Sequence, residues 1–481
     1  MKLILIISAI LFYLTSTSQY QIHHYLDGSD DEKAADFFEY NGNYTVLAST
    51  RSHHLNTENI TLIHTKGYLN EFYQLFPSNN YAYPTKIIKT DDGYLISAIK
   101  FYYDKRQDAT LIKLDENLEM IWEKSYGGHH RDQAFSVIET SDEGYLISGR
   151  SRSYLEGDIG AYFFVKTNIN GDTLWQRTYG DKNEKDYLFD VKQDNNGDFY
   201  AIGNQNGFEN YSTFDFSQGL ATPTIFKLSS TGDSLWQKFY PSTQNEFYNQ
   251  IEISPINGFY ILGSTQENTL GSFDILLSKF DWNGNLEWKK TFGDTLFDYG
   301  STMFISDDNH IYIAGSTCRD TANYTTDVQI IKTDLNGNII WSRVYAEAYS
   351  DYPVKIIPTE DGNISILINK TFKTSHKNGI SIIKMDVNGN NIVPSYNSKE
   401  TTFRIFPNPS TNGINIKLSD QITCGNIDIQ IFSLQGKLIT TQNIKYNEVN
   451  YVSTRSWSSG VYVYRATSTC GTNTYGKFIV R

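Results

Sequence analysis

The sequence predicts an all-β protein, and three of its features support that fold class. Tyrosine (35 residues) and phenylalanine (28) are abundant while proline (10) is scarce, and aromatic residues favour strands. Asn-Gly and Asp-Gly turns recur between short apolar or alternating runs, as at Asp281–Asn285, and predict tight β-hairpins. This strand-and-turn pattern returns at a regular interval, which is typical of β-propeller blades.

One copy of the repeat spans Tyr162–Gly203, and its tryptophan belongs to an x-G-x-x-x-W hairpin. The tryptophans of this hairpin are separated by 53, 61, 52 and 53 residues; they are Trp122, Trp175, Trp236, Trp288 and Trp341. Small residues of the other hairpin keep the same spacing, at Gly149, Gly203, Gly263 and Gly315. Both series contain one longer interval, so we expect an insertion between Gly203 and Thr224.

Each repeat contains two hairpins, so each repeat predicts one four-stranded antiparallel blade. Copies of the first hairpin lie near 37–49, 85–98, 135–149, 189–203, 250–263, 302–315 and 354–368. Copies of the second lie near 60–76, 110–126, 162–179, 224–240, 275–292, 328–345 and 380–396. The last copy lacks the tryptophan and carries Pro394, which cannot donate to a strand ladder. We therefore expect residues 19–396 to form a seven-bladed propeller, closed by an extra strand at Tyr20–Leu26.

Residues 1–18 have the pattern of a secretory signal peptide. Lys2 precedes an apolar run, and small residues at Ser16 and Ser18 precede an expected cleavage site before Gln19. The run is about a dozen residues long, shorter than the ~20 that span a bilayer. We therefore expect a secreted protein with no transmembrane segment in the mature chain.

The net charge of −13 argues against a nucleic-acid partner, which would require clustered lysine and arginine. Both hairpins of a blade turn tightly on one side of a propeller, whereas longer loops, such as the one across 204–223, fall on the other. Long loops on a rigid scaffold usually carry recognition. We expect a binding module for an extracellular protein or glycan. The alternative is an extracellular hydrolase or lyase that acts on glycans or other polymers, although no residue can be assigned as catalytic.

A carboxylate follows each tryptophan by ten or eleven residues, in the loop that leads to the next blade; the set is Asp132, Asp186, Glu246, Asp298 and Asp351. Two interpretations remain open. The five residues could form an acidic funnel at the channel mouth that attracts a cation such as calcium. Alternatively, each could accept hydrogen bonds from its own turn or from the next blade. No other metal-binding pattern is present, and no cofactor is predicted.

The tryptophans are expected to lock neighbouring blades by burying aromatic surface. The hairpins KTNINGDTLWQ, KFDWNGNLEWK and KTDLNGNIIWS resemble the docking repeat of quinoprotein-type propellers. That resemblance implies the blade structure alone. The calcium-binding side chains and catalytic aspartate of quinoprotein dehydrogenases have no counterparts that can be placed here, so we expect no quinone.

The last 80 residues contain three strand-rich blocks, Phe403–Leu418, Ile427–Ile439 and Ser458–Arg481, separated by turns. Their alternating pattern predicts a small antiparallel, immunoglobulin-like sandwich at 403–481, after a polar linker at 397–402. The blocks resemble the type A C-terminal sorting domain of the type IX secretion system of Bacteroidetes. The residues that carry the resemblance are Pro407, Asn408, Pro409, Gly413, Gly436, Gly460, Tyr462 and Lys477.

This resemblance implies export by the type IX secretion machinery and a location outside the cell, either released or attached to the surface. Cys424 and Cys470 lie in this segment. They would meet oxidising conditions after export and could either form a disulfide or remain free. Cys318 is the single cysteine of the predicted propeller.

Overall fold

The computed structural model describes residues 32–481 except 52–57, 67–68, 75–80, 103–105, 155–159, 182–183, 206–219, 268, 270–271, 321–324, 346–349, 372–377, 391–402, 407–409, 419–426, 434–436, 445–448 and 469–472. The described residues form strands and turns without a helix, which confirms the predicted all-β class. They therefore include no helix long and apolar enough to cross a membrane. The chain divides into two compact units, Met1–Val393 and Pro394–Arg481.

In the first unit, successive strands pair in chain order as antiparallel sheets. Sheet 1 contains β1 (Glu32–Tyr40), β2 (Asn43–Arg51), β3 (Glu58–Lys66) and β4 (Leu69–Gln74). Sheet 2 contains β5 (Tyr81–Thr90), β6 (Gly93–Phe101), β7 (Gln107–Leu114) and β8 (Met120–Tyr126). Sheet 3 contains β9 (Asp132–Glu139), β10 (Tyr145–Ser151), β11 (Ala161–Thr167) and β12 (Thr173–Tyr179). Sheet 4 contains β13 (Asp186–Gln193), β14 (Phe199–Gln205), β15 (Thr222–Leu228) and β16 (Ser234–Phe239).

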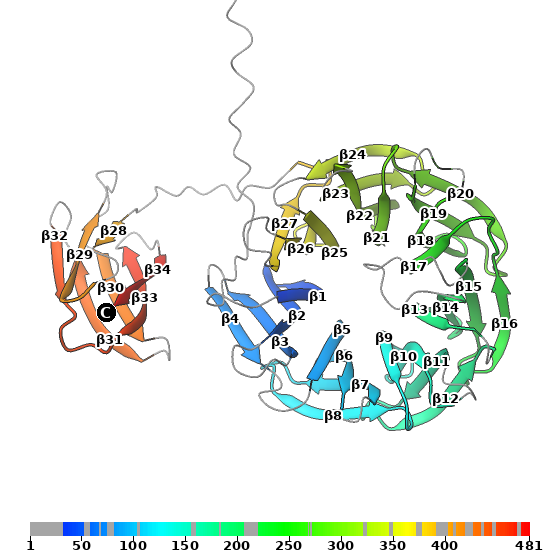
Figure 1. The fold of residues 1–481 in the computed structure, drawn as a ribbon, viewed down its shortest axis with the longest axis horizontal. Coiled ribbons are helices and arrows are strands. Elements are labelled where there is room, and N and C mark those ends of the chain that lie inside the picture. Colours follow the sequence, from blue (N-terminus) through cyan, green and yellow to red (C-terminus); the bar gives the residue numbers. More distant parts are fainter. Residues whose placement is uncertain are drawn as a thin grey trace, which may run out of the picture. The chain divides into compact units, whose positions relative to one another are not determined.

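The remaining sheets of this unit follow the same order. Sheet 5 contains β17 (Glu246–Ile253), β18 (Phe259–Thr265), β19 (Asp274–Phe280) and β20 (Leu286–Phe292). Sheet 6 contains β21 (Asp298–Ile305), β22 (His310–Asp320), β23 (Thr325–Asp334) and β24 (Ile339–Tyr345). Sheet 7 has three described strands, β25 (Ser350–Pro358), β26 (Ile364–Thr371) and β27 (Asn378–Met385). Figure 1 shows these sheets arranged as a ring, with the first strand of each nearest the centre.

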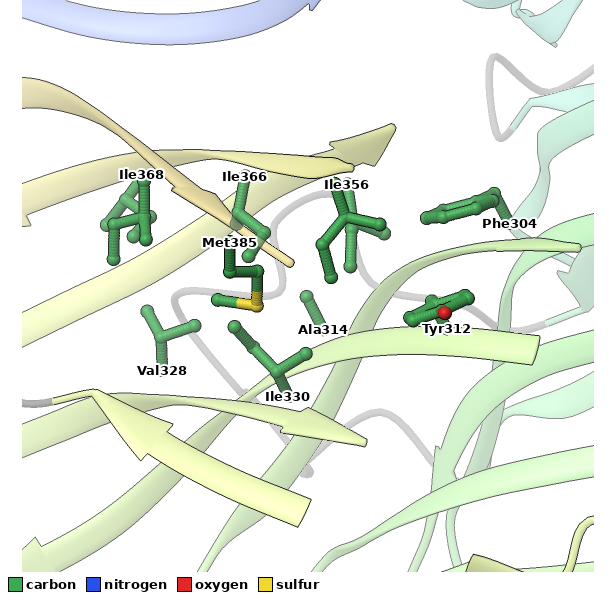
Figure 2. Packing of buried hydrophobic residues seen from close by; sticks show 11 residues of the cluster. Phe304, Tyr312, Ala314, Val328, Ile330, Ile356, Ile366, Ile368 and Met385 are labelled. Carbon is green, nitrogen blue, oxygen red and sulfur yellow. The ribbon is translucent and has the colours of Figure 1, made fainter. Parts of the chain in front are cut away.

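The hydrophobic core of the ring lies between neighbouring sheets rather than in one central mass. The core cluster between sheets 6 and 7 joins residues such as Tyr312 and Ile330 to Ile356, Ile366 and Met385 (Figure 2). Every other pair of neighbouring sheets has an equivalent cluster among the described residues. Each sheet therefore depends on the next for its apolar burial, as expected of a repeat architecture.

Sheets 7 and 1 are joined by side chains. Leu367, Ile380 and Ile382 of sheet 7 pack with buried residues of sheet 1. The Asn369 side chain also accepts a 2.8 Å hydrogen bond from the Ala34 N–H and donates one of 3.0 Å to the Ala34 carbonyl. The predicted closing strand at 20–26 and Pro394 lie outside the described residues.

The first strand of every sheet contains a β-bulge at the same place. The unpaired bulge residues are Ala35, Thr85, Phe135, Phe189, Asn249, Ser301 and Val354. A bulge bends the strand and increases its twist. At each bulge the first strand therefore has one more residue than the second strand with which it pairs.

The second unit is built from two sheets. One orders β28 (Phe403–Phe406), β29 (Gly413–Leu418) and β32 (Val449–Ser453). The other orders β31 (Leu438–Ile444), β30 (Ile427–Ser433), β33 (Gly460–Ser468) and β34 (Asn473–Val480). Ile414 and Ile416 of the first sheet share one core with Ile429, Ile431 and other residues of the second. The two sheets thus pack face to face.

Candidate functional site

The two sides of the ring differ in their connections. Because the strands of each sheet run antiparallel in chain order, both hairpin turns of a sheet lie on one side, which we call the tight-turn side. The connections between hairpins and between sheets lie on the opposite side, which we call the long-loop side. A candidate functional site is therefore sought first by asking which side has polar and aromatic groups that the fold does not already use.

On the tight-turn side, each of the five repeated tryptophans contacts a glycine turn of the next sheet. The Trp175 indole lies so close to Gly232 that a Cβ there would come within 2.8 Å of the ring. The Tyr179 hydroxyl donates a 2.6 Å hydrogen bond to the Gly232 carbonyl, and the Arg177 guanidinium lies over the indole. Gly232 also has a φ of +83°, which favours glycine. The turn is therefore fixed by the sheet before it.

The same contact recurs around the ring. The tryptophan–glycine pairs are Trp122–Gly171, Trp175–Gly232, Trp236–Gly284, Trp288–Gly337 and Trp341–Gly389. All five indoles are partly buried. Carboxylates on this side have cationic partners as well: Lys113 donates a hydrogen bond to Asp92 and holds the pKa of that carboxyl below its usual range. The tight-turn side is thus largely committed to holding the ring together.

On the long-loop side, the predicted carboxylates stand at one position, three residues before the bulge. Asp132, Asp186, Glu246 and Asp298 each begin the first strand of their sheet, and Asp351 is the second residue of β25. In sheet 1 this position is Glu32 and in sheet 2 it is Ala82. The five predicted carboxylates are at most 2% exposed. The structure thus places them at the same level of the ring but turns them away from solvent.

Three of the five side chains have clear partners within the fold. Asp132 accepts hydrogen bonds from the Gly128 N–H (2.7 Å) and the Ser153 hydroxyl (2.6 Å). Asp298 accepts one from the Asp294 N–H (2.9 Å). Glu246 forms an ion pair of 2.6 Å with Lys289. These contacts fit the structural interpretation of the carboxylates better than the acidic funnel.

Asp186 has a different environment. It is fully buried, and burial raises its pKa to about 7, helped by the nearby Glu184 carboxylate. Neither carboxylate oxygen has a partner that meets strict hydrogen-bond geometry. Asp186 is therefore the carboxylate of this set that is most easily protonated near neutral pH.

The structure also reveals carboxylates that the sequence pattern did not single out. Asp108, Asp274 and Asp327 stand near the start of the third strand in sheets 2, 5 and 6, at the level of the predicted set. Burial raises the pKa of all three. Their common position in the strand register is the signal that could have found them, but only after the hairpins had been aligned residue by residue.

A belt of polar contacts joins the first strands around the ring centre. The residue after each bulge contributes to it; the set is Asp36, Lys86, Ser136, Asp190, Gln250, Thr302 and Lys355. For example, Ser136 donates a 2.8 Å hydrogen bond to Asp190, which accepts one of 3.3 Å from the Ile251 N–H. The belt is structural, because its groups are used between sheets.

Aromatic side chains gather on the long-loop side. Phe247, Phe273, Phe297 and Tyr299 form a cluster at sheets 5 and 6, with centroid distances of 5.3 to 6.3 Å between neighbouring rings. Tyr352, at the start of β25, is 44% exposed. Phe247 and Phe273 are buried, whereas Phe297 and Tyr299 are only partly buried. Partly exposed aromatic rings are common in recognition surfaces, because they offer a large contact area.

No group of three His, Cys, Asp or Glu side chains that could hold a metal is found among the described residues. Cys318 is buried and unbridged. Cys424 and Cys470 lie outside the described residues, as do Pro407, Asn408, Pro409 and Gly436 of the C-terminal pattern.

The other members of that pattern lie in the strands of the second unit. Gly413 begins β29, Gly460 begins β33 and Lys477 lies in β34. Tyr462 is buried, and its hydroxyl donates a 2.8 Å hydrogen bond to the Ser458 carbonyl. Tyr462 therefore serves the core of the second unit.

The fold and the C-terminal unit together define an exported β-protein with a propeller-like ring. Residues 404–481 match the family described as the secretion system C-terminal sorting domain. This match confirms the resemblance seen in the sequence and implies export through the type IX system to the cell surface or the medium. The sequence matches no curated protein.

Several solved structures are similar to the chain. Puromycin hydrolase has 8% identity and a TM-score of 0.49, over 90% of this chain and 58% of that chain. The β-propeller domain of the trilobed protease from Pyrococcus furiosus has 8% identity and a TM-score of 0.42, over 77% of this chain and 98% of that chain. The Pyrococcus horikoshii acylaminoacyl peptidase has 11% identity and a TM-score of 0.44, over 80% of this chain and 57% of that chain.

Proposed function

We propose that this chain is a secreted seven-bladed β-propeller that binds an extracellular ligand through its long-loop side. In this proposal residues 1–18 are a signal peptide, 19–396 the propeller and 397–402 a linker. Residues 403–481 form an immunoglobulin-like sorting sandwich that the type IX machinery of a Bacteroidetes host recognises. The seven sheets of the described ring and the core cluster between every neighbouring pair support the blade number.

The difference between the two sides of the ring is the observation that carries the binding role. On the tight-turn side, glycine turns are covered by tryptophan, tyrosine and cationic side chains of the preceding sheet. On the long-loop side, the aromatic rings of Tyr352 and Tyr154 are 44% and 42% exposed. A ligand therefore has more to contact on the long-loop side.

The chemistry of that side favours a glycan or a polypeptide as the ligand. Exposed tyrosines stack on sugar rings or on apolar side chains and donate hydrogen bonds through their hydroxyls. The buried carboxylates are mostly used within the fold, so we assign them no direct contact with the ligand.

A matched pair of tyrosines tests the proposal. Tyr352 on the long-loop side and Tyr40 on the tight-turn side are 44% and 45% exposed. The purified protein would be screened against arrays of extracellular glycans and proteins, and hits would be measured by calorimetry. We expect Tyr352→Ala to weaken binding at least about tenfold, since aromatic contacts at interface centres often contribute more than 1.4 kcal/mol. Tyr40→Ala should bind as the wild type does.

Equal losses from both variants, or binding that neither affects, would contradict the assignment of the binding side. Incubation with each bound polymer, followed by assay of newly formed chain ends, separates the binding role from the hydrolase or lyase alternative. Release of fragments by the wild-type protein would replace a binding role with a catalytic one.

A further inference from the structure

Two buried aspartates face each other where sheet 5 meets sheet 6 on the long-loop side. Asp274 begins β19 and Asp298 begins β21, and the Asp298 N–H donates a 2.6 Å hydrogen bond to the Phe273 carbonyl. A Cβ on Gly293 would lie 2.5 Å from Asp274 Oδ1 and 2.8 Å from Asp298 Oδ2. Both oxygens therefore border the same small space beside the Gly293 backbone.

This space is negatively charged and poorly solvated. Asp274 is 4% exposed and Asp298 is 1% exposed. Asp274 Oδ1 has no hydrogen-bond partner. Burial raises the pKa of Asp274 to about 6, and the neighbouring Asp298 and Asp294 carboxylates raise it as well. At neutral pH the two buried charges repel each other unless a positive charge offsets them.

Two other junctions of the ring show how the chain supplies that positive charge. Asp108 approaches Asp132 between sheets 2 and 3, and Arg106 lies 3.7 Å from the Asp108 carboxylate. At the junction of sheets 6 and 7, Asp327 approaches Asp351. There the Arg319 guanidinium lies 2.9 Å from the Asp327 carboxylate. At each junction an arginine stands next to the third-strand aspartate: Arg106 lies just before β7, and Arg319 lies near the end of β22.

The junction of sheets 5 and 6 lacks such an arginine in the part of the chain that the structure describes. No lysine or arginine among these residues forms an ion pair with Asp274. The charged groups that shift its pKa are both carboxylates, those of Asp298 and Asp294. The same pair of acidic residues is thus present without the cation that accompanies it elsewhere.

We propose that a calcium ion binds between Asp274 and Asp298 and supplies the positive charge that an arginine supplies beside the third-strand aspartate at the other two junctions. Calcium prefers carboxylate and carbonyl oxygens and completes its shell with water. With two carboxylates, the affinity should fall in the weak range of extracellular modules, about 10⁻⁴–10⁻³ M. The ion would join sheet 5 to sheet 6 and so stabilise the folded ring.

Thermal melts of the mature chain near pH 7.5 test this proposal, first in a chelator and then at increasing CaCl₂ up to about 10 mM. We expect the Tm to rise and to saturate in the millimolar range. Asp274→Asn should abolish the rise. In the chelator this variant should melt at or above the wild-type temperature, because it removes the repulsion from Asp298.

Asp327→Asn is the matched control, because Asp327 has the equivalent strand position but already has Arg319. It should keep the full response to calcium. The proposal fails if CaCl₂ leaves the wild-type Tm unchanged, or if Asp274→Asn keeps the response. It also fails if only acidification stabilises the protein, because a shared proton would then account for the pair. Calorimetric titration of the wild-type protein with CaCl₂ gives a second measurement that needs no variant, and the absence of saturable heat would also overturn the proposal.

Discussion

The Nζ of Lys355 in sheet 7 lies 2.6 Å from Oδ1 of Asp36 in sheet 1, so an ion pair links the last described sheet of the ring to the first. Asp36 also accepts a 3.0 Å hydrogen bond from the Ile87 N–H of sheet 2. One carboxylate thereby connects three successive sheets at the point where the ring closes.

Lys355→Met should destabilise the ring by about 3 kcal/mol, because it leaves the buried Asp36 carboxylate without its cation. Chemical denaturation measures this change. Lys33→Met, whose side chain is exposed on β1, is the control and should change stability by no more than about 0.5 kcal/mol. The double variant Asp36→Asn/Lys355→Met should recover part of the loss, and no recovery would mean that Lys355 acts through packing instead.

Trp236→Ala should lower the Tm of the whole ring, with a cost of about 3–5 kcal/mol from lost contact and a residual cavity. The indole packs with residues of sheets 4 and 5 and lies against Gly284 of sheet 5. Leu235→Ala is the control, because the neighbouring Leu235 is 52% exposed. A thermal melt that is the same for Trp236→Ala and the wild type would rule out the blade-locking role.

Asp186→Asn should make the protein more stable at alkaline pH. The folded-state pKa of Asp186 is raised to about 7 from an ordinary value of 3.8. The folded protein therefore holds this proton more tightly than the unfolded chain does. The stability that the group contributes is complete below pH 4 and is lost as pH rises through 7.

Asparagine cannot ionise, so the variant should gain on the wild type by up to ~1.4 kcal/mol per pH unit within that window. Denaturation curves across the window measure the difference. Asp132→Asn is the control: its carboxylate already accepts hydrogen bonds from Gly128 and Ser153, so it should lose stability near neutral pH. A constant offset between Asp186→Asn and the wild type at every pH would contradict the assignment of the raised pKa.

Removal of residues 403–481 should leave the ring folded but retain it in the periplasm, because the sorting domain at 404–481 carries the export signal. Cell fractionation in a host with a type IX system measures the location, and limited proteolysis checks that the ring is intact. A variant that keeps 403–481 and carries Tyr352→Ala controls for general effects of mutation on export. Efficient export of the truncated chain would contradict the role of the domain.

The repeat made much of the fold predictable from sequence. The spacing of Trp175 and Trp236 placed equivalent strands in successive sheets, and the glycine of each turn located the hairpins. Contacts along one hairpin follow from sequence spacing alone, because the turn fixes the register. Export of the protein was predictable for a similar reason, because the pattern of the sorting domain is local to the last 80 residues.

The carboxylate pairs were not predictable in the same way. Asp298 was found because it follows a tryptophan, but Asp274 meets it only across a junction between two sheets. The bulge three residues after Asp298 depends on the pairing of two strands and leaves no mark in either strand alone. Whether a carboxylate is buried or exposed depends on the packing around it, so the sequence alone could not weigh the acidic funnel against the hydrogen-bonded interpretation.

The tryptophan–glycine contacts all run the same way around the ring, from each sheet to the next one in the chain. Trp341 of sheet 6 reaches forward to Gly389, whereas the last repeat has no tryptophan of its own. Sheet 7 therefore receives a tryptophan contact from sheet 6 but provides none to sheet 1. A gene duplication that added a tryptophan-bearing repeat before the last one would preserve every tryptophan–glycine contact. The first repeat also lacks a tryptophan, so the junctions of sheet 1 with sheets 7 and 2 depend on other contacts, such as the ion pair of Asp36 with Lys355 and its hydrogen bond with Ile87.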